Sequence, residues 1–389
     1  MGDGLSVLVV GGGIGGLALA GGLAREGATV ELLERAPAWR PVGAGIVLGA
    51  NAVAVLGALS AGARLTELGH PLAAMRVLDA QGGELQRMDM AALAATIGPT
   101  YTLNRPDLHQ LLMEGAAGAE LRLGETVDAL EDGPDGVTAR LSRGEERRYD
   151  LVIGADGLRS RVRALAFPGA RAEVRYAGYT CWRFVMDDPE SREDAVEMWG
   201  AGLRVGLVPL RGGRLYGFLT ENAPPRGVDP ERDRHAWVAA KYAGFGGPAP
   251  AVMEALADRP DVPLMRHDIE DLSAQVWRGQ RIALLGDAGH ATTPNLGQGA
   301  GMALEDALAL VRCLRTASDP SAALAAYEAM RSARVAAVVR TSRQLGAMAQ
   351  WSHPLAVALN NLAARCVPNA LSRRSLTALV RPGLELARG

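Results

Sequence analysis

Three glycines near the N-terminus stand at a spacing that can hold a phosphate group. Gly11, Gly13 and Gly16 match the pattern G-x-G-x-x-G, directly after an apolar run and directly before an Ala/Leu-rich stretch. In this motif the first glycine permits a tight turn, the second lets the backbone approach a pyrophosphate, and the third lets helix and strand pack closely. The start of the helix adds free N–H groups and the positive end of its dipole. The pattern predicts a dinucleotide-binding site.

An acidic residue follows where a ribose would be recognised. Glu34 ends the second apolar run, and a carboxylate at that strand end can accept a hydrogen bond from a ribose 2′-hydroxyl. A 2′-phosphate would be repelled there. The site therefore predicts FAD or NAD as its ligand, rather than NADP.

The segment 282–310 favours FAD over NAD. Its apolar run delivers Asp287 to a strand end, where ligands of open α/β sheets bind and where the carboxylate can accept hydrogen bonds from ribityl hydroxyls. A loop with Pro294, Gly297 and Gly299 then leads into a helix. The N–H groups at that helix start would face the flavin pyrimidine ring and stabilise the negative charge of reduced flavin.

A third buried run ends in Asp156 and Gly157 and is followed by Arg159, Arg161 and Arg163. Asp156 can bond to the flavin chain or to an adjacent loop. The arginines offer positive charge to a phosphate-bearing cofactor, although arginines at a helix start are commonly solvated. By itself, this segment is weaker evidence for a cofactor than the other two.

The three motifs together resemble those of the single-component FAD monooxygenases with the para-hydroxybenzoate hydroxylase fold. GGGIGG with Glu34, GADG at 154–157, and GDAGHATTP at 286–294 followed by GQG occur in the family's order. The resemblance implies that NADPH or NADH reduces FAD and that a flavin hydroperoxide then hydroxylates or epoxidises a small aromatic or conjugated substrate. It implies no separate Rossmann domain for the nicotinamide. Carried over position by position, it implies FAD contacts from Gly11, Gly13, Gly15, Gly16, Glu34, Arg35, Ala44, Gly45, Arg105, Val127, Asp156, Asp287, Pro294, Gly297, Gln298, Gly299 and Ala300.

Within that family, the pattern is similar to urate hydroxylases, salicylate hydroxylases and zeaxanthin epoxidase-like enzymes. The similarity to urate hydroxylase implies that Arg204 and Tyr216 face the substrate. The alternative for both is a position on the sheet without substrate contact. Two departures weaken urate as the substrate. Asn295 stands where an acidic residue is expected, and Cys181-Trp182 replaces a more polar pair.

The expected fold class is α/β, with a Rossmann-like FAD-binding domain and an inserted, mainly β substrate domain. Short β-branched and aromatic runs between Gly/Pro turns predict the second sheet. Residues 101–118 predict a helix entered through Asn104-Arg105-Pro106. The expected division is a discontinuous FAD-binding domain over 1–70, 100–170 and 275–345, a substrate domain over 71–99 and 171–274, and a helical segment over 346–389 that covers a sheet or meets a partner.

Composition excludes several other classes of protein. The 389 residues carry a formal net charge of −2, which gives no support for nucleic-acid binding. Three widely spaced cysteines and scattered histidines predict no metal site and no disulfide framework, which fits the cytoplasm. No apolar run is long enough to span a membrane. His267 is expected to make a structural contact, and His290 to satisfy local backbone. Oligomeric state stays open.

Three alternative functions use the same scaffold. A flavin-dependent halogenase would need a tryptophan-rich signature and a catalytic lysine, whereas Lys241, the one lysine, lies in a Gly-rich stretch. A flavin-dependent reductase or dehydrogenase of an isoprenoid-like substrate would consume no O₂. A non-enzymatic lipid-binding escort protein would be colourless. Arginine-rich surface loops favour NADPH over NADH without deciding between them.

Overall fold

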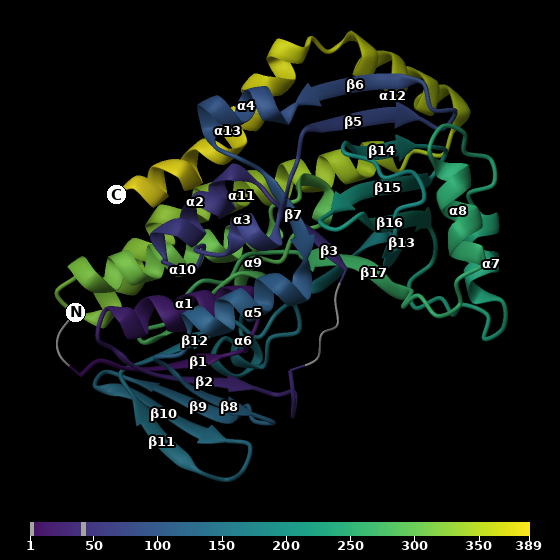
Figure 1. Ribbon diagram of the computed structural model, residues 1–389. Helices are drawn as coiled ribbons and strands as arrows, with labels where there is room; N and C mark the ends of the chain where they lie inside the picture. The colour runs from purple at the N-terminus through teal and green to yellow at the C-terminus, as the bar shows by residue number, and fades with distance from the viewer. Residues whose placement is uncertain (1–3, 40–43) are drawn as a thin grey trace.

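The computed structural model describes residues 4–39 and 44–389, whose strands form two main sheets at opposite ends of the molecule (Figure 1). The first sheet is fully parallel, in the order β18-β12-β1-β2-β8. Its strands are β1 (Ser6–Val10), β2 (Thr29–Glu34), β8 (Glu120–Leu123), β12 (Leu151–Gly154) and β18 (Ile282–Leu284).

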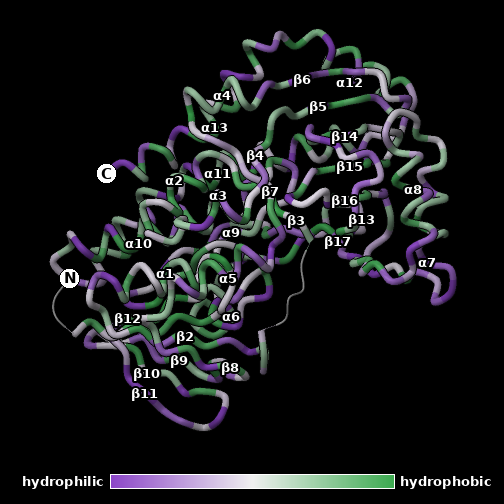
Figure 2. Tube along the Cα trace, viewed as in Figure 1, coloured by the Kyte–Doolittle hydropathy of each residue, from purple (hydrophilic) through white to green (hydrophobic). Residues whose placement is uncertain are grey.

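This parallel sheet is covered on both faces, which explains its uninterrupted apolar runs. In β1, Val7 and Val9 belong to the core beneath the helices, whereas Leu8 and Val10 pack toward a second, three-stranded sheet. The helices of this part are α1 (Ile14–Arg25), α2 (Ala50–Ala58), α3 (Leu65–Leu68), α5 (Arg105–Gly115), α6 (Arg161–Ala166), α9 (Asp287–His290), α10 (Gly299–Thr316) and α11 (Pro320–Ala349), with a 3₁₀ turn η1 (Pro294–Leu296). The covering sheet consists of β9 (Val127–Gly133), β10 (Gly136–Leu141) and β11 (Glu146–Tyr149). Figure 2 shows hydrophobic residues near β12, between the helices and the three-stranded sheet, and a hydrophilic outer loop beside β11.

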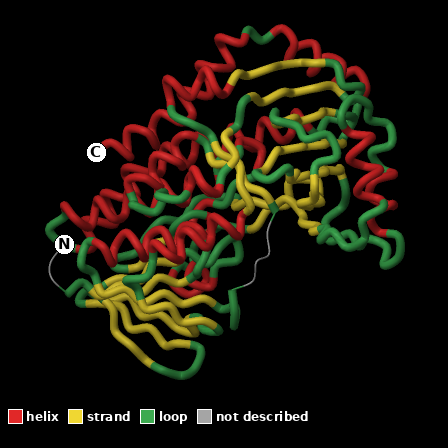
Figure 3. The backbone as a smooth tube through the Cα atoms, viewed as in Figure 1, coloured by secondary structure: helices red, strands yellow, loops and turns green. Residues whose placement is uncertain are grey.

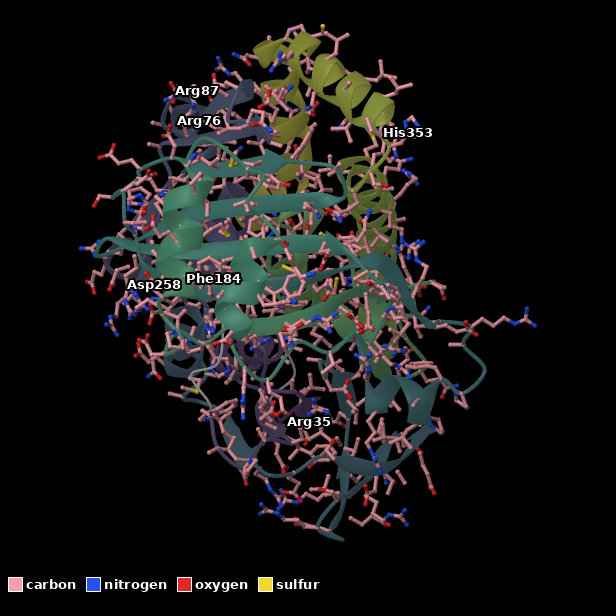
Figure 4. All side chains as sticks on the ribbon, turned by 90° about the vertical axis from the view of Figure 1, so that its right-hand side faces the viewer. Arg35, Arg76, Arg87, Phe184, Asp258 and His353 are labelled. Carbon is pink, nitrogen blue, oxygen red and sulfur yellow. The ribbon has the colours of Figure 1, made fainter. Side chains whose placement is uncertain are left out.

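The second main sheet has seven strands in the order β17-β13-β16-β15-β14-β5-β6. Its strands are β5 (Ala74–Asp79), β6 (Glu84–Asp89), β13 (Val174–Asp187), β14 (Ala195–Trp199), β15 (Leu203–Leu210), β16 (Arg214–Asn222) and β17 (Met265–Leu272). Two helices the sequence did not predict, α7 (Arg234–Ala240) and α8 (Ala249–Ala257), cover its outer face over Trp182 and Phe184 (Figure 4). The expected α/β architecture with a second, largely antiparallel sheet is therefore present (Figure 3).

A small sheet joins the two parts and corrects one prediction. Its strands are β3 (Gly45–Leu48), β4 (His70–Pro71) and β7 (Tyr101–Asn104). The helix predicted over 101–118 is wrong in its first turn, because residues 101–104 pair with β3 and α5 begins only at Arg105. The buried partners of Thr102 and Leu103 outweigh helix propensity there.

The chain ends in helices, as predicted. Helix α4 (Met90–Ile97) follows β6, and the last two helices are α12 (Pro354–Cys366) and α13 (Asn369–Arg388). Figure 1 shows α12 and α13 along the rim of the molecule, beyond β5 and β6. Helix α13 also packs against α2, which links this rim to the helical layer. No helix among residues 4–39 and 44–389 is long and apolar enough to cross a membrane.

Candidate functional site

The three sequence motifs meet at one edge of the parallel sheet. Val10 of β1 pairs with Gly154 of β12, and Gly154 pairs with Leu284 of β18. Because the strands are parallel, the segments that follow them leave the sheet at the same level. The glycine loop, Asp156 and Asp287 are thereby brought to one edge, where α/β sheets bind ligands.

Three glycines of the N-terminal loop are required by the packing of the protein itself. Gly11 has φ +113°, and a Cβ there would lie 2.5 Å from the carbonyl oxygen of Ala155. A Cβ on Gly16 would collide with the carbonyl oxygen of Gly11, and one on Gly15 with the side chain of Leu285. Because these positions carry no side chain, the chain can turn tightly after β1 and α1 can pack closely against its neighbours.

Three other predicted glycines face open space, which fits a bound ligand. A Cβ on Gly13, Gly297 or Gly299 would meet no atom within 4 Å. Gly13 is the N-cap of α1, and Gly299 begins α10; neither helix has a side-chain cap at its N-terminus. Uncapped N–H groups and a surface without side chains form a cradle for phosphate and for the flavin ring. The residues present therefore fit FAD.

Glu34 is oriented by the glycine loop. Its carboxylate accepts hydrogen bonds from the N–H groups of Gly12 and Ala36, both at 2.9 Å. Each oxygen retains a second lone pair that can accept a ribose hydroxyl. The next residue, Arg35, has an exposed side chain near this loop (Figure 4).

Asp287 and Arg105 lie close enough for the charge of Arg105 to act on the Asp287 carboxyl. Asp287 begins α9. Solvent reaches its side chain, although many protein atoms lie around the carboxyl group. Desolvation raises the pKa of Asp287, while the positive charges of His290 and Arg105 oppose that rise. The Arg105 N–H donates to the carbonyl of Ala44 at 3.1 Å, which fixes the start of α5 against β3. Arg105 thus places an exposed guanidinium where a phosphate or flavin chain can reach it.

Asp156 bonds to the adjacent loop, one of the two partners predicted for it. Its carboxylate accepts from the Ser160 hydroxyl at 2.5 Å and from the Arg161 and Val162 N–H groups at 2.6 and 3.1 Å. The Val127 side chain lies in the core, and its carbonyl accepts from Arg161 Nε at 2.5 Å.

The arginines after Asp156 bind protein groups rather than offering free charge. Arg159 contacts Glu270, Arg161 contacts Asp128, and Arg163 donates to the Ala288 carbonyl at 2.6 Å. The phosphate role suggested for them is therefore not supported. They instead tie the Asp156 segment to its neighbours.

A buried polar network holds the loop before α10. The Asn51 amide donates to Gln298 at 2.9 Å and to Glu305 at 2.7 Å. Arg331 pairs with Glu305 at 2.7 Å and with Asp306 at 2.8 Å, and all three of these charged side chains are buried. The rest of the predicted loop differs in exposure: Pro294 is exposed, whereas Ala300 packs against the core.

His290 belongs to this network. Its Nε2 lies 2.6 Å from Asp306, and the same carboxylate accepts the Gly286 N–H at 3.0 Å. The prediction that His290 satisfies local backbone is wrong, because its partner is a buried carboxylate. The network therefore fixes the residue immediately before Asp287.

One face of the seven-stranded sheet lies toward the cofactor edge; we call it the substrate face. Strand alternation places Trp182 and Phe184 under α7 and α8, and their neighbours on the opposite side. The substrate face carries Tyr179, Cys181, Arg183, Tyr216, Phe218, His267 and Ile269. The Tyr179 hydroxyl donates to Asn295 Oδ1 at 3.1 Å, which connects this face to the loop before α10, residues 291–298, which we call the flavin loop.

Arg204 lies on the substrate face, since it pairs with Thr220 and Thr220 pairs with Cys181, and all sides of its guanidinium contact protein groups. It contacts Glu197 at 3.1 Å, Asn295 at 3.0 Å and Gln350 at 2.8 Å, and its side chain is 5% exposed. Its Cζ also lies 5.3 Å from the Tyr179 ring centroid. Direct substrate contact by Arg204 stays a prediction; the observed contacts join β15, the flavin loop and the end of α11.

Tyr216 lies where the two parts meet. A Cβ on Gly45 would collide with the Tyr216 side chain, so the glycine at the start of β3 lets this ring pack against the backbone. Burial raises the pKa of Tyr216 to about 12, although the positive charge of Arg183 opposes the rise. Tyr216 therefore stays protonated at neutral pH and can donate a hydrogen bond.

Arg183 and His267 are site residues that the sequence analysis did not assign to the substrate. In the part of the chain that the structure describes, Arg183 forms no salt bridge with a carboxylate, and the groups that act most strongly on its charge are Cys181, Tyr216 and Tyr179. His267 bonds through its carbonyl to Thr180, while its imidazole has no hydrogen bond within the described part of the chain. The sequence contained one signal for Arg183. Cys181 and Arg183 alternate with Trp182 and Phe184, which places the two pairs on opposite faces of a strand.

Two further expectations concern metal and Lys241. Among residues 4–39 and 44–389, no group of three His, Cys, Asp or Glu side chains could hold a metal ion. Lys241 follows α7 directly, where its Nζ pairs with Glu221 at 2.9 Å and lies 4.1 Å from the Trp237 ring centroid. These contacts lie on the outer side of the sheet, away from the flavin edge.

Comparisons with known proteins agree with this geometry. A model of the "FAD binding domain" family matches residues 4–342. The chain is 39% identical over 360 residues to aurachin C monooxygenase/isomerase of Stigmatella aurantiaca, covering 92% of each chain. It is 37% identical over 380 residues to 2-heptyl-3-hydroxy-4(1H)-quinolone synthase of Pseudomonas aeruginosa, covering 95% of this chain and 96% of that one. The solved structure of Klebsiella pneumoniae HpxO with FAD and uric acid superimposes with a TM-score of 0.89, at 29% identity and 97% coverage of each chain.

Proposed function

The chain belongs to the FAD-binding monooxygenase family, and from this premise we propose that it uses NADPH or NADH and O₂ to hydroxylate a flat N-heteroaromatic substrate of the quinolone type. The substrate lies between the flavin and the substrate face. The single observation that carries this choice is Arg183, a cation that has no carboxylate partner among residues 4–39 and 44–389 and lies among aromatic and apolar side chains of the substrate face.

The other side chains around Arg183 suit a fused ring with polarity at one end. Cys181 and Ile269 are buried apolar groups, and the Phe218 ring lies over Gly206, where a Cβ would collide with it. Urate has hydrogen-bonding groups on every edge, and an apolar surface would leave several of them unsatisfied. A ring oxygen on one edge needs only one strong donor, which Arg183 provides.

Each polar group has a distinct task in this proposal. FAD, when bound, supplies the oxygen-transfer chemistry. The Arg183 guanidinium and the Tyr216 hydroxyl donate to the ring oxygen and stabilise the negative charge that develops there when the ring is activated. An imidazole nitrogen of His267 accepts the proton released from the ring N–H or hydroxyl.

The first test replaces the unpaired cation. Arg183→Gln is expected to lower kcat/KM by about 10- to 100-fold, the loss typical of one hydrogen bond to a charged group. The variant should also consume NAD(P)H with more release of H₂O₂, because a misplaced ring accepts oxygen less often. Steady-state rates with simultaneous O₂, H₂O₂ and product measurements check both effects.

Arg171→Gln is the matched control, since Arg171 is exposed on the same part of the chain, outside the substrate face. Arg183→Lys should recover part of the loss. If Arg183→Gln retains the kcat/KM and coupling of the unmodified enzyme, Arg183 does not recognise the substrate.

The second test uses pH. Desolvation, followed by the charges of Arg183 and Arg105, lowers the pKa of His267, so the neutral base persists to lower pH than an ordinary histidine. The acidic limb of kcat/KM should therefore lie below about pH 6.5. Arg183→Gln removes one positive charge and should move that limb toward higher pH. An acidic limb that is unchanged in His267→Gln would rule out histidine as the proton acceptor.

A substrate panel tests the reaction class. Purified holoenzyme is incubated with 4-quinolones, hydroxybenzoates and urate, each with NADPH or NADH. We expect a quinolone to accelerate NAD(P)H oxidation with matching O₂ uptake and little H₂O₂. Turnover without O₂ uptake would instead support the reductase alternative, and selective turnover of urate would overturn the quinolone assignment.

A further inference from the structure

Helix α12 presents its apolar side to solvent. Leu355, Leu359 and Leu362 are 75%, 63% and 59% exposed. They recur at the spacing that places residues on one helical face, so they form a continuous strip, which we call the leucine stripe. Neighbouring Trp351 and Leu371 are also exposed, at 40% and 53%.

The opposite side of α12 carries Val357, Asn360, Asn361 and Ala364, and it faces the protein. Asn360 is 8% exposed, and the Ala364 carbonyl accepts a hydrogen bond from Gln86 of β6 at 3.1 Å. A helix on the surface of a globular protein ordinarily buries its apolar face. Helix α12 instead buries Asn360 and leaves its three leucines exposed, and the leucine stripe has no partner within the described part of the chain.

The adjoining helix carries unpaired positive charge. Residues 354–389 contain five arginines and one glutamate, although the whole chain has a net charge of −2. Arg373, Arg374 and Arg381 line an open hollow of ≈ 430 Å³ between α13 and α4. Within the described residues none of these three guanidinium groups forms a salt bridge, and we call the three residues the arginine group.

We propose that α12 and α13 dock this protein onto an anionic phospholipid membrane. The leucine stripe enters the boundary between headgroups and acyl chains, and the arginine group binds lipid phosphates from the same rim of the molecule (Figure 1). This is attachment in the plane of the interface. It agrees with the finding that no described helix could cross a bilayer.

Charge favours a membrane over a second copy of the chain. In a symmetric dimer the same patch would face itself, which would bring the two arginine groups close together. An anionic bilayer can accept the leucine stripe in its apolar region and the arginine group at its phosphates at the same time. The proposal rests on α12 and α13 alone and does not depend on the substrate assigned above.

Vesicle sedimentation of the full-length holoenzyme tests the proposal. We expect binding to phosphatidylcholine vesicles that contain phosphatidylserine and much weaker binding to phosphatidylcholine alone. Leu355→Gln/Leu359→Gln/Leu362→Gln should reduce binding to both vesicle types by at least about tenfold. Arg373→Gln/Arg374→Gln/Arg381→Gln should reduce binding to the anionic vesicles by about 100-fold, roughly fivefold for each arginine.

Matched controls lie elsewhere on the surface. Val228→Gln alters an apolar residue that is 91% exposed, and Arg171→Gln alters an exposed arginine; both should bind vesicles as the unmodified protein does. The FAD-to-protein ratio of every variant verifies folding. Absence of vesicle binding, or binding that neither triple variant weakens, overturns the proposal. So does a dimer that sedimentation velocity shows to dissociate when the leucine stripe is replaced.

Discussion

Gly13→Asp is expected to lower FAD affinity by at least about 100-fold while the apoprotein stays folded. A Cβ at Gly13 meets no protein atom, and the φ and ψ angles of −77° and −175° are accessible to any residue. Aspartate is a favourable N-cap, so α1 should gain stability in the absence of cofactor. With cofactor, the carboxylate would occupy the pyrophosphate position and repel its charge. Fluorescence titration of apoprotein with FAD, alongside thermal unfolding, measures both quantities.

Two further variants distinguish this explanation from general damage. Gly169→Asp also introduces a side chain into open space without a positive φ, and should leave FAD affinity unchanged. Gly16→Ala should instead destabilise the apoprotein, because its Cβ collides with the Gly11 carbonyl. Full FAD occupancy in Gly13→Asp at micromolar protein would show that the pyrophosphate lies elsewhere.

Arg331→Met is expected to lower the free energy of unfolding by about 3–5 kcal/mol, the usual cost of leaving buried charge unpaired. Arg331 is 2% exposed and pairs with Glu305 and Asp306, both of which are 0% exposed. Removing the guanidinium leaves two carboxylates together in the interior. FAD affinity should fall as well, because these carboxylates hold Asn51 and the Gly286 N–H beside the flavin loop.

The pH dependence of the Arg331→Met variant identifies the cause. Desolvation acts to raise the pKa of Asp306, but His290 and Arg331 outweigh it and hold that pKa below its usual value. In the unmodified protein the ionised Asp306 carboxylate therefore adds to the free energy of unfolding at pH values above the ordinary carboxylate pKa. This contribution is lost as pH falls. In the variant the buried Asp306 carboxylate has lost the charge of Arg331 and resists ionisation, so the loss of stability relative to the unmodified protein should grow as pH rises from about 4 to 7.

Urea unfolding at several pH values measures this deficit. Arg340→Met, on the exposed side of the same helix, is the matched control and should change stability by less than about 0.5 kcal/mol. A deficit in Arg331→Met that does not change with pH would mean that lost packing, rather than unpaired charge, is the cause.

Local sequence was sufficient for the elements that carry the cofactor motifs. The strand–glycine loop–helix at residues 5–25 and the strand that ends before Asp287 follow from short-range patterns, because a doubly buried strand must be apolar and a phosphate turn needs glycine. The error at 101–104 arose because a short stretch beside a helix start reads as helix unless its β3 partner is known. Helices α7 and α8 were missed among the strands of the second sheet for a similar reason: their identity depends on what they cover.

The assignment of polar side chains needed the tertiary structure. Arg183 of β13 and Arg204 of β15 belong to the same sheet, and nothing in the local sequence distinguishes an arginine that has a carboxylate partner from one that has none. The partners of Arg204 come from Glu197, Asn295 and Gln350, which are far apart in the chain.

By itself the sequence determined the α/β class, the parallel FAD sheet and the family of the enzyme, because backbone constraints on a cofactor are recorded in glycines and strand ends. Only the tertiary structure decided which charges are compensated and which apolar surfaces are covered. The roles proposed for Arg183 and for the leucine stripe of α12 follow from their surroundings in the folded chain. The physical reason is that electrostatic and hydrophobic energies depend on neighbours in space, and those neighbours come from distant parts of the chain.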